Sequence, residues 1–207
     1  MLFRSSLGID LNVRHRGARV SGSLGFFTHQ FRGYIYQQEI ASHLIPRANN
    51  PEELRVMQYV AKDAEFNGAE VELTFHLVRE AKRTLDLDLG ADTVRATNKS
   101  TRENLPRIPA RQYSAKLAYG HQDVLVALEV HHKAAQTRAA HDESTTPRHT
   151  LLNASATWRL RDGRRTWEVF LRGTNLTNAV AREHASFLKE FAPLPGRGLG
   201  GGARLHF

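Results

Sequence analysis

Cysteine is absent from the 207-residue chain, which excludes a disulfide framework and thiol chemistry. Long apolar runs are also absent, since no window approaches the roughly 18–20 apolar residues that a membrane-spanning helix requires. The opening stretch MLFRSSLGID has no long apolar core, so we expect neither a secretory signal nor an anchoring helix in it. These absences do not exclude a β-barrel, because its alternating apolar residues cancel in an averaged hydropathy.

Signatures of catalysis are missing as well. The sequence has no HExxH and no nucleophile elbow, and its Ser, His and Asp residues are too scattered to nominate a triad. The stretch GRGLGGG (196–202) leads into an alternating run, whereas a phosphate-binding glycine loop leads into a helix. We therefore expect no enzymatic activity and no cofactor.

The charge balance is strongly positive, with a net charge of +8 and a pI near 10.2, which raises nucleic acid as a partner. The basic residues do not form one stripe, however, and they cluster where alternating runs end. These clusters comprise Arg14, Arg16, Arg79, Lys82, Arg83, Arg161, Arg164 and Arg165. Clusters at turns favour a solvated rim, or one facing anionic head groups, so we expect no nucleic-acid partner.

Apolar residues recur at every second position along most of the chain. Residues 71–77, for example, carry Val, Leu, Phe and Leu with Glu, Thr and His between them, the pattern of a strand. A helix is disfavoured because Glu70, Asp86 and Glu129 would then fall among the apolar positions. The alternation predicts nine strands, at about 3–14, 17–38, 56–78, 84–97, 109–120, 123–135, 150–160, 165–175 and 198–207.

Two stretches interrupt this pattern. FTHQFRG (27–33) predicts a bend or a short helical turn within the second strand. NPEELRVMQ (50–58) predicts a short loop helix, because Pro-Glu-Glu is a typical helix start.

The connections alternate strictly between two lengths. Short turns are predicted at 14–17, 79–83, 120–123 and 161–165, and long polar loops at about 41–54, 97–108, 136–149 and 176–196. An antiparallel up-and-down meander with short turns at one end and long loops at the other is the layout of a transmembrane β-barrel. The fold class predicted is therefore all-β, a nine-stranded portion of such a barrel. The alternative is a soluble β-sandwich that binds an acidic partner.

The predicted strands have two different faces. The apolar face would meet lipid, with Tyr113, Tyr119, Trp158 and Trp167 as candidates for an interfacial aromatic girdle. The alternative is that these four rings are core aromatics of a sandwich. The polar face would line a wet lumen and carries Asp10, Glu70, Glu72, Asp86, Asp88, Lys116, Glu129, Arg159, Glu168 and Arg172.

The run GTNLTNAVAREHASFLKEFAPLPGRGLGGGARLHF resembles the C-terminal end of TonB-dependent outer-membrane receptors. In that family an asparagine-bearing turn precedes a loop, "LPGR", a glycine-bearing last strand and a final aromatic residue. Shorter matches in the family's order are YIYQQE (34–39), YVAKDAEFNGAEVEL (59–73), LPRIPARQYSAKL (105–117) and TLLNASATWRL (150–160).

The resemblance implies a barrel of about 22 strands filled by a plug domain, in the Gram-negative outer membrane. It implies import of a scarce nutrient, such as an iron–siderophore or a metal ion, with energy transmitted through TonB. Residues 1–207 would then be the C-terminal barrel portion, a half-barrel without the plug and the N-terminal strands, so TonB would act only through the missing plug. A non-functional gene remnant is the other alternative.

Histidines and carboxylates in the outer loops suggest a metal site, because imidazole and carboxylate are ligands for zinc and other divalent metals. The candidates are His131, His141, Asp142, Glu143, His149 and His184. SFLKE (186–190) also resembles a segment of a receptor branch thought to import zinc. The alternative is that these are solvated loop residues, because no HxH or HxxxH spacing supports a site.

Two further sets of residues suggest membrane partners. The alternate positions Ala203, Leu205 and Phe207 resemble the terminal signal by which the barrel-assembly machinery recognises its clients. Basic loop residues could meet outer-membrane lipopolysaccharide phosphates, although general surface charge explains them equally well. These residues are Arg47, Lys99, Arg102, Lys133, Arg138 and Arg148.

Overall fold

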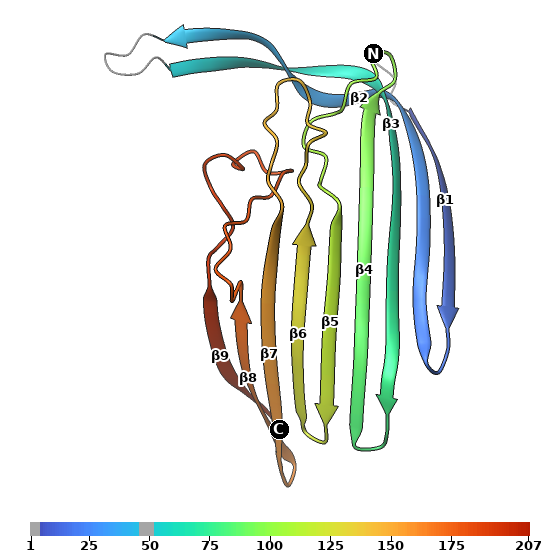
Figure 1. Cartoon of the computed structure of the whole chain (residues 1–207), viewed down its shortest axis with the longest axis vertical. Helices are drawn as coiled ribbons and strands as arrows, with labels where there is room; N and C mark the ends of the chain where they lie inside the picture. Colours follow the sequence, from blue (N-terminus) through green and yellow to red (C-terminus); the bar gives the residue numbers. More distant parts are fainter. Residues whose placement is uncertain (1–4, 46–51) are drawn as a thin grey trace.

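The computed structural model describes residues 5–45 and 52–207, and the side chains of all of these except 43–45 and 52–54. The described residues form nine strands in one antiparallel sheet that follows chain order (Figure 1). The strands are β1 (Ser5–Arg16), β2 (Val20–Ile45), β3 (Glu52–Arg79), β4 (Arg83–Asn98), β5 (Gln112–His121), β6 (Val124–Lys133), β7 (His149–Asp162), β8 (Arg165–Thr174) and β9 (Gly198–His206). The predicted nine-stranded meander is confirmed.

The two ends of the sheet differ as the sequence predicts (Figure 1). Short turns join β1 to β2, β3 to β4, β5 to β6 and β7 to β8 at one end. At the other end lie three long connections, 99–111, 134–148 and 175–197, which we call the outer loops. Among the described residues, no helix has the length and apolar character needed to cross a membrane.

The strand register places apolar and polar residues in separate rows. Leu87, Leu117, Leu128 and Ala154 are direct neighbours across β4–β7. One position along each strand, a polar row runs through Asp88, Lys116, Glu129 and Asn153. Because successive side chains of a strand point to opposite faces, one face of the sheet is apolar and the other is polar.

The apolar face has no second layer over it in the described part of the chain. Leu7, Ile9 and Leu11 of β1 are 61–68% exposed, and Trp158 is 51% exposed. A β-sandwich would bury this face against another sheet, so the sandwich alternative is wrong. An exposed apolar face of this extent fits contact with lipid.

The four rings predicted as a girdle lie near the ends of the strands on the apolar face. Trp158, Trp167 and Tyr119 are near the short turns, as predicted for an aromatic girdle. Tyr113 lies instead at the outer-loop end of β5. The core-aromatic alternative is wrong, because all four rings are 42–51% exposed.

The polar face is linked by ion pairs between neighbouring strands. Glu168 of β8 accepts from Arg159 Nε of β7 at 3.1 Å and from Arg204 Nη1 of β9 at 3.2 Å. Lys116 Nζ of β5 lies 3.8 Å from Asp88 Oδ2 of β4. These pairs agree with the prediction of a polar inner face whose charges pair across strands.

Strands β2 and β3 continue beyond their neighbours as a bent two-stranded arm, residues 34–45 and 52–62, which extends across the outer-loop end (Figure 1). The arm begins at a bulge between Phe31 and Tyr34, where Gly33 has φ of 69°. The expected interruption at 27–33 is therefore a β-bulge and not a helical turn.

The arm also corrects two other expectations. Most of the loop predicted at 41–54 is strand, and the helix predicted at 50–58 is strand from Glu52 onward. Residues 50 and 51 lie outside the described ranges. Beyond the apolar belt neither face of the hairpin needs to be apolar, so the alternation that marks a strand in the sequence is weak there.

A small core fixes the base of the arm. Ala64, Ala96 and Leu105 are at most 2% exposed, and Phe31, Tyr34, Tyr36, Phe66 and Ile108 pack around them. The Tyr34 and Phe66 rings meet edge to face at 5.1 Å. This packing joins β2, β3 and β4 to the first outer loop and so sets the direction of the arm.

Candidate functional site

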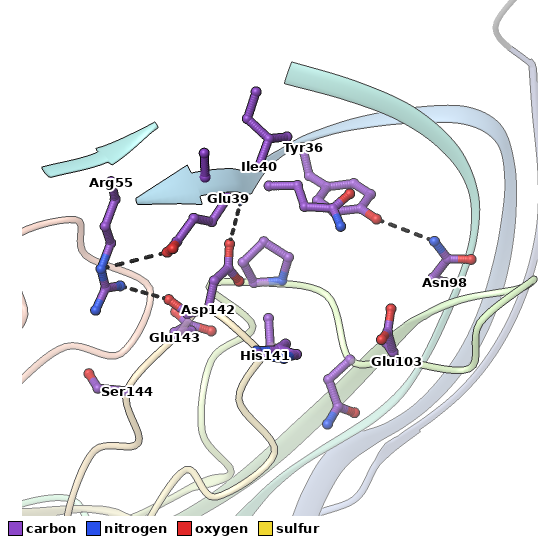
Figure 2. A pocket seen from close by; sticks show the side chains of 15 residues that line it. Tyr36, Glu39, Ile40, Arg55, Asn98, Glu103, His141, Asp142, Glu143 and Ser144 are labelled. Carbon is purple, nitrogen blue, oxygen red and sulfur yellow. Dashed lines mark hydrogen bonds and ion pairs between the residues drawn. The ribbon is translucent and has the colours of Figure 1, made fainter. Parts of the chain in front are cut away.

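A cavity of about 600 Å³ lies between the arm and the first two outer loops (Figure 2). We call it the outer cavity. Its charged lining comprises Glu39 and Arg55 from the arm, Glu103 from the first loop, and Asp142 and Glu143 from the second. Tyr36, Asn98 and His141 also line it. Four carboxylates thus face one guanidinium in this cavity.

The arm is held to the second outer loop through Asp142 (Figure 2). The backbone N–H of Glu39 donates to Asp142 Oδ2 at 2.8 Å, and Arg55 Nη1 donates to the Asp142 carbonyl oxygen at 2.9 Å. Arg55 Nε also lies 3.6 Å from Glu39 Oε2. These contacts close one side of the outer cavity.

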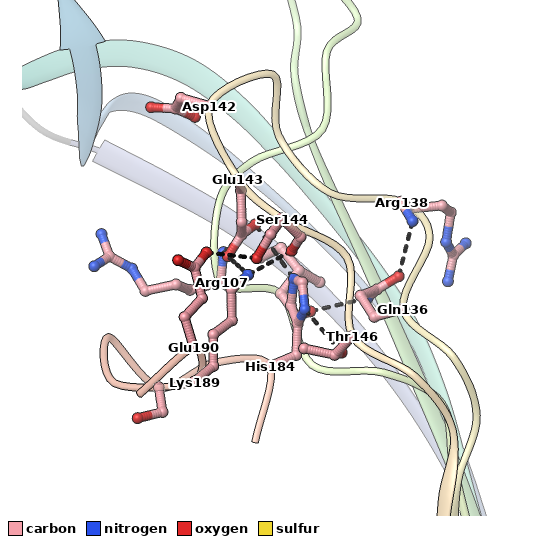
Figure 3. Close-up of polar contacts among 12 residues, drawn as sticks. Arg107, Gln136, Arg138, Asp142, Glu143, Ser144, Thr146, His184, Lys189 and Glu190 are labelled. Atoms are coloured by element: carbon pink, nitrogen blue, oxygen red, sulfur yellow. Dashed lines mark hydrogen bonds and ion pairs between the residues drawn. The ribbon is translucent and has the colours of Figure 1, made fainter. Parts of the chain in front are cut away.

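The three outer loops meet at Glu143 (Figure 3). Both of its carboxylate oxygens accept from the backbone N–H of Arg107 at 3.1 Å. Lys189 Nζ lies 2.9 Å from Glu143 Oε1, and His184 Nε2 lies 3.3 Å from Oε2. Burial by itself would raise the pKa of Glu143, but His184, Lys189 and the Arg107 N–H outweigh it and lower the pKa to about 2.

Further contacts fasten the same junction. Lys189 Nζ donates to the Ser144 carbonyl oxygen at 2.7 Å, and His184 Nδ1 lies 3.1 Å from Thr146 Oγ1. The Arg107 guanidinium lies 3.6 Å from the centre of the Phe187 ring and donates to Gln37 Oε1 of the arm. The arm and all three loops therefore form one interlocked outer assembly.

The family model described as "TonB dependent receptor-like, beta-barrel" matches residues 5–176. The chain belongs to this family. Its members are transporters of the Gram-negative outer membrane, which confirms the predicted location and the prediction that the chain is not an enzyme.

A solved structure with the same fold is described as "Copper transporter OprC", with a TM-score of 0.74 and 16% sequence identity. The match covers 98% of this receptor chain and 31% of that protein, so the chain spans about a third of the length of the protein it matches. The likeness supports the identification of the nine strands as a portion of a receptor barrel.

The six residues predicted as metal ligands are divided between two places. His141, Asp142 and Glu143 line the outer cavity, and His184 contacts Glu143. The remaining two, His131 and His149, line a different cavity on the polar face of the sheet. No group of three or more His, Asp or Glu residues within 5–45 and 52–207 is already arranged to hold a metal ion.

Several residues of the outer assembly were not predicted from the sequence. Glu39, Arg55 and Glu103 line the outer cavity. The residue pattern of their segments gives no sign that they contact the histidine-bearing loops. Lys189 is the least expected, since only 7% of its side chain is exposed. A weak signal exists in the sequence, because Lys189 and Glu190 are flanked by the apolar residues Leu188 and Phe191.

The basic loop residues have different surroundings. Lys133, the last residue of β6, is paired with Glu183 of the third outer loop, and its contact with lipopolysaccharide stays a prediction. Lys99 donates to Gln30 Oε1 at 3.0 Å. Arg47 lies outside the described residues.

The residues predicted as an assembly signal lie on the last strand. Ala203 and Leu205 are paired with Val169 and Trp167 of β8, in line with the apolar face, and Phe207 follows the end of β9 fully exposed. Their placement at a sheet edge is compatible with the predicted signal, which stays a prediction.

Proposed function

We propose that this chain is the barrel portion of a TonB-dependent receptor that captures a divalent metal cation in the outer cavity. The observation that carries the proposal is the charge of that cavity. Glu39, Glu103, Asp142 and Glu143 line it in a chain whose net charge is +8. Even with Arg55 and Lys189 paired to two of them, carboxylates remain in excess.

The lining residues also have the chemistry that a metal cation requires. Carboxylate oxygens and the His141 imidazole are ligands for zinc and related ions. An anionic iron chelate would instead be repelled by the same carboxylates, so among the predicted nutrients we favour the metal ion over the siderophore. The solved structure with the same fold is described as a copper transporter, and copper is also a metal cation, but at 16% identity the likeness supports only the fold.

Capture requires a small adjustment of the cavity, since no ligand set is preassembled in the described residues. Glu103 and His141 line the same cavity as Asp142 and would approach it on binding, while Glu143 stays paired with Lys189 and His184. Import would then follow the family mechanism, with energy supplied through TonB acting on parts of the receptor other than these nine strands.

The test is isothermal titration calorimetry of Zn²⁺ binding to the whole receptor that carries this chain, purified in detergent. The variant Glu103→Gln/Asp142→Asn keeps the side-chain shapes and the acceptor oxygen for the Glu39 N–H, and removes two charges. We expect Zn²⁺ affinity to fall about tenfold or more, equivalent to about 1.4 kcal/mol. Glu190→Gln, an outer-loop carboxylate that accepts from Ser144 Oγ and does not itself line this cavity, is the matched control and should leave Zn²⁺ affinity unchanged.

Ferric citrate serves as the anionic probe in the same assay. Stronger binding of ferric citrate than of Zn²⁺, or a double variant that binds Zn²⁺ like the unmodified receptor, would overturn the proposal.

A further inference from the structure

The four short turns, with the strand ends beside them, carry most of the positive charge of the chain. We call residues 14–19, 79–83, 120–123 and 161–165 together the basic rim (Figure 1). The rim holds nine lysine and arginine residues against three carboxylates, a surplus of six in a chain of net charge +8. The basic residues are Arg14, Arg16, Arg19, Arg79, Lys82, Arg83, Arg161, Arg164 and Arg165, and the acidic ones are Glu80, Asp123 and Asp162.

Ion pairs within the basic rim leave this surplus largely intact. Arg83 Nη2 lies 2.8 Å from Glu80 Oε2, and Arg161 Nη2 lies 3.3 Å from Asp123 Oδ1. Among the described residues, Lys82 and the other rim arginines form no ion pair with a carboxylate, and all of them are exposed. These cations are therefore available to a negatively charged partner outside the chain.

Backbone hydrogen bonds join neighbouring turns of the basic rim. The N–H of Gln122 donates to the Lys82 carbonyl oxygen at 2.9 Å, which links the β5–β6 turn to the β3–β4 turn. The N–H of Arg159 donates to the Asp123 carbonyl oxygen at 2.8 Å, which links the β5–β6 turn to β7. The backbone beneath the charges is thus fixed before a partner binds, and this lowers the entropy cost of binding.

One rim arginine lies in line with the apolar face. Leu160 and Trp167 are cross-strand partners on that face, and two positions further toward the turn Asp162 is opposite Arg165. Because side chains alternate along a strand, Arg165 is on the same face as Trp167.

The β4–β5 pair repeats this order of residues. Leu85 is opposite Tyr119 on the apolar face, and two positions further toward the turns Arg83 is opposite His121. The rings of Tyr119 and His121 stack with their centres 6.5 Å apart. At both places the apolar face ends in an aromatic ring followed by a basic side chain, the order expected where a protein crosses from lipid to water.

We propose that the basic rim binds the headgroups of anionic phospholipids in the leaflet at the short-turn end. Arginine and lysine near a membrane surface attract anionic headgroups, and the arginine fork matches phosphate oxygens in pairs. An acidic protein would meet the same charge, but it would not explain why Arg83 and Arg165 are aligned with the lipid-facing rows. In outer-membrane barrels the short turns face the periplasm, so the lipids are those of the periplasmic leaflet. This site rests on the family and the fold and does not depend on capture of a cation.

Quenching of tryptophan fluorescence by brominated lipids tests the site where it lies. Trp158 and Trp167 are the two tryptophans of this chain, and both are beside the β7–β8 turn. The whole receptor is reconstituted in vesicles, and subtracting the signal of Trp158→Phe/Trp167→Phe isolates these two rings. Brominated phosphatidylglycerol should bind there about fivefold more tightly than brominated phosphatidylcholine, and salt should reduce the difference.

Three variants assign the preference to the basic rim. Arg164→Gln/Arg165→Gln should bring the two lipids close to equal affinity. Arg164→Lys/Arg165→Lys keeps both charges and should keep most of the preference. Arg102→Gln/Arg148→Gln removes the same charge from the outer loops, at the other end of the sheet, and should keep the full preference.

Equal quenching of the unmodified receptor by the two lipids would overturn the lipid site and favour an acidic protein as the partner of the rim. An unchanged preference in Arg164→Gln/Arg165→Gln would overturn it as well. Neither result bears on Zn²⁺ binding in the outer cavity, which Arg164→Gln/Arg165→Gln should leave unchanged.

Discussion

Lys189 and Glu143 form an ion pair between the third and second outer loops, with Nζ 2.9 Å from Oε1 and less than a tenth of either side chain exposed. The pair lies beneath the outer cavity, and the Arg107 N–H connects it to the first loop. The shape of the proposed capture site therefore depends on a contact between two segments far apart in the sequence.

Replacing Lys189 should loosen all three outer loops. In Lys189→Met the buried Glu143 carboxylate loses the ammonium that lies 2.9 Å from it, which costs about 1–3 kcal/mol of local stability. We expect trypsin to cleave the outer loops at least several times faster, measured by mass spectrometry of the fragments. Lys99→Met removes a lysine of the first outer loop whose ammonium donates to Gln30, and it should leave the cleavage rate of the other two loops unchanged. Equal rates in both variants would contradict the role of the pair.

Acid should open the same junction. The pKa of Glu143 is lowered from its ordinary 4.5 to about 2, so its contribution to stability is complete above pH 4.5 and is lost as the pH falls toward 2. Pepsin, which is active in this range, should cleave the third outer loop faster as the pH falls, relative to an unstructured peptide. In Glu143→Gln, pepsin should already cleave the third outer loop fast at pH 4.5. If this variant shows the same dependence of cleavage on pH as the unmodified receptor, Glu143 is not the group that makes the junction sensitive to acid.

Close backbone approach in the sheet predicts a glycine that cannot be replaced. A Cβ at Gly22 would lie 2.3 Å from the carbonyl oxygen of Glu72 on the neighbouring strand, so Gly22→Ala must separate β2 from β3. We expect a loss of about 1–3 kcal/mol in urea unfolding from detergent micelles. Gly200→Ala is the control, because a Cβ there meets no atom within 4 Å. Comparable stabilities of the two variants would disprove the predicted crowding.

The two faces of the sheet should respond oppositely to charge. Leu117→Arg places a guanidinium on the apolar face, and near the bilayer midplane this costs about 2–4 kcal/mol. Ala127→Arg places the same group on the polar face beside Lys116 and Glu129 and should be tolerated. Folding yield into lipid vesicles measures the difference, and equal yields would contradict the assignment of the faces.

The strands within the apolar belt could be predicted closely from the sequence. The strand expected at 165–175 is β8 (Arg165–Thr174), and the one expected at 123–135 is β6 (Val124–Lys133). A sheet between lipid and water imposes strict alternation, which is why the signal is strong. Only the outer part of the arm, residues 41–45 and 52–55, is predicted as a loop and a short helix, because outside that belt the constraint on side-chain polarity disappears.

The candidate site was predictable only in part. Histidines and carboxylates of the second loop stood out by their chemistry, and His141, Asp142 and Glu143 do line one cavity. The pairing of Glu143 with Lys189 could not be foreseen, since it depends on how two loops fold over the sheet. His131 was expected in an outer-loop site, but its position on the polar face follows from strand parity, which places it in the row of Glu72.

Capture of a divalent cation is tested most directly by anomalous X-ray scattering at the zinc absorption edge, from crystals of the receptor grown with Zn²⁺. We predict an anomalous peak in the outer cavity within reach of Glu103, His141 and Asp142, and its loss in Glu103→Gln/Asp142→Asn. A receptor whose anomalous peaks all lie elsewhere, with the outer cavity empty at saturating Zn²⁺, would contradict the account.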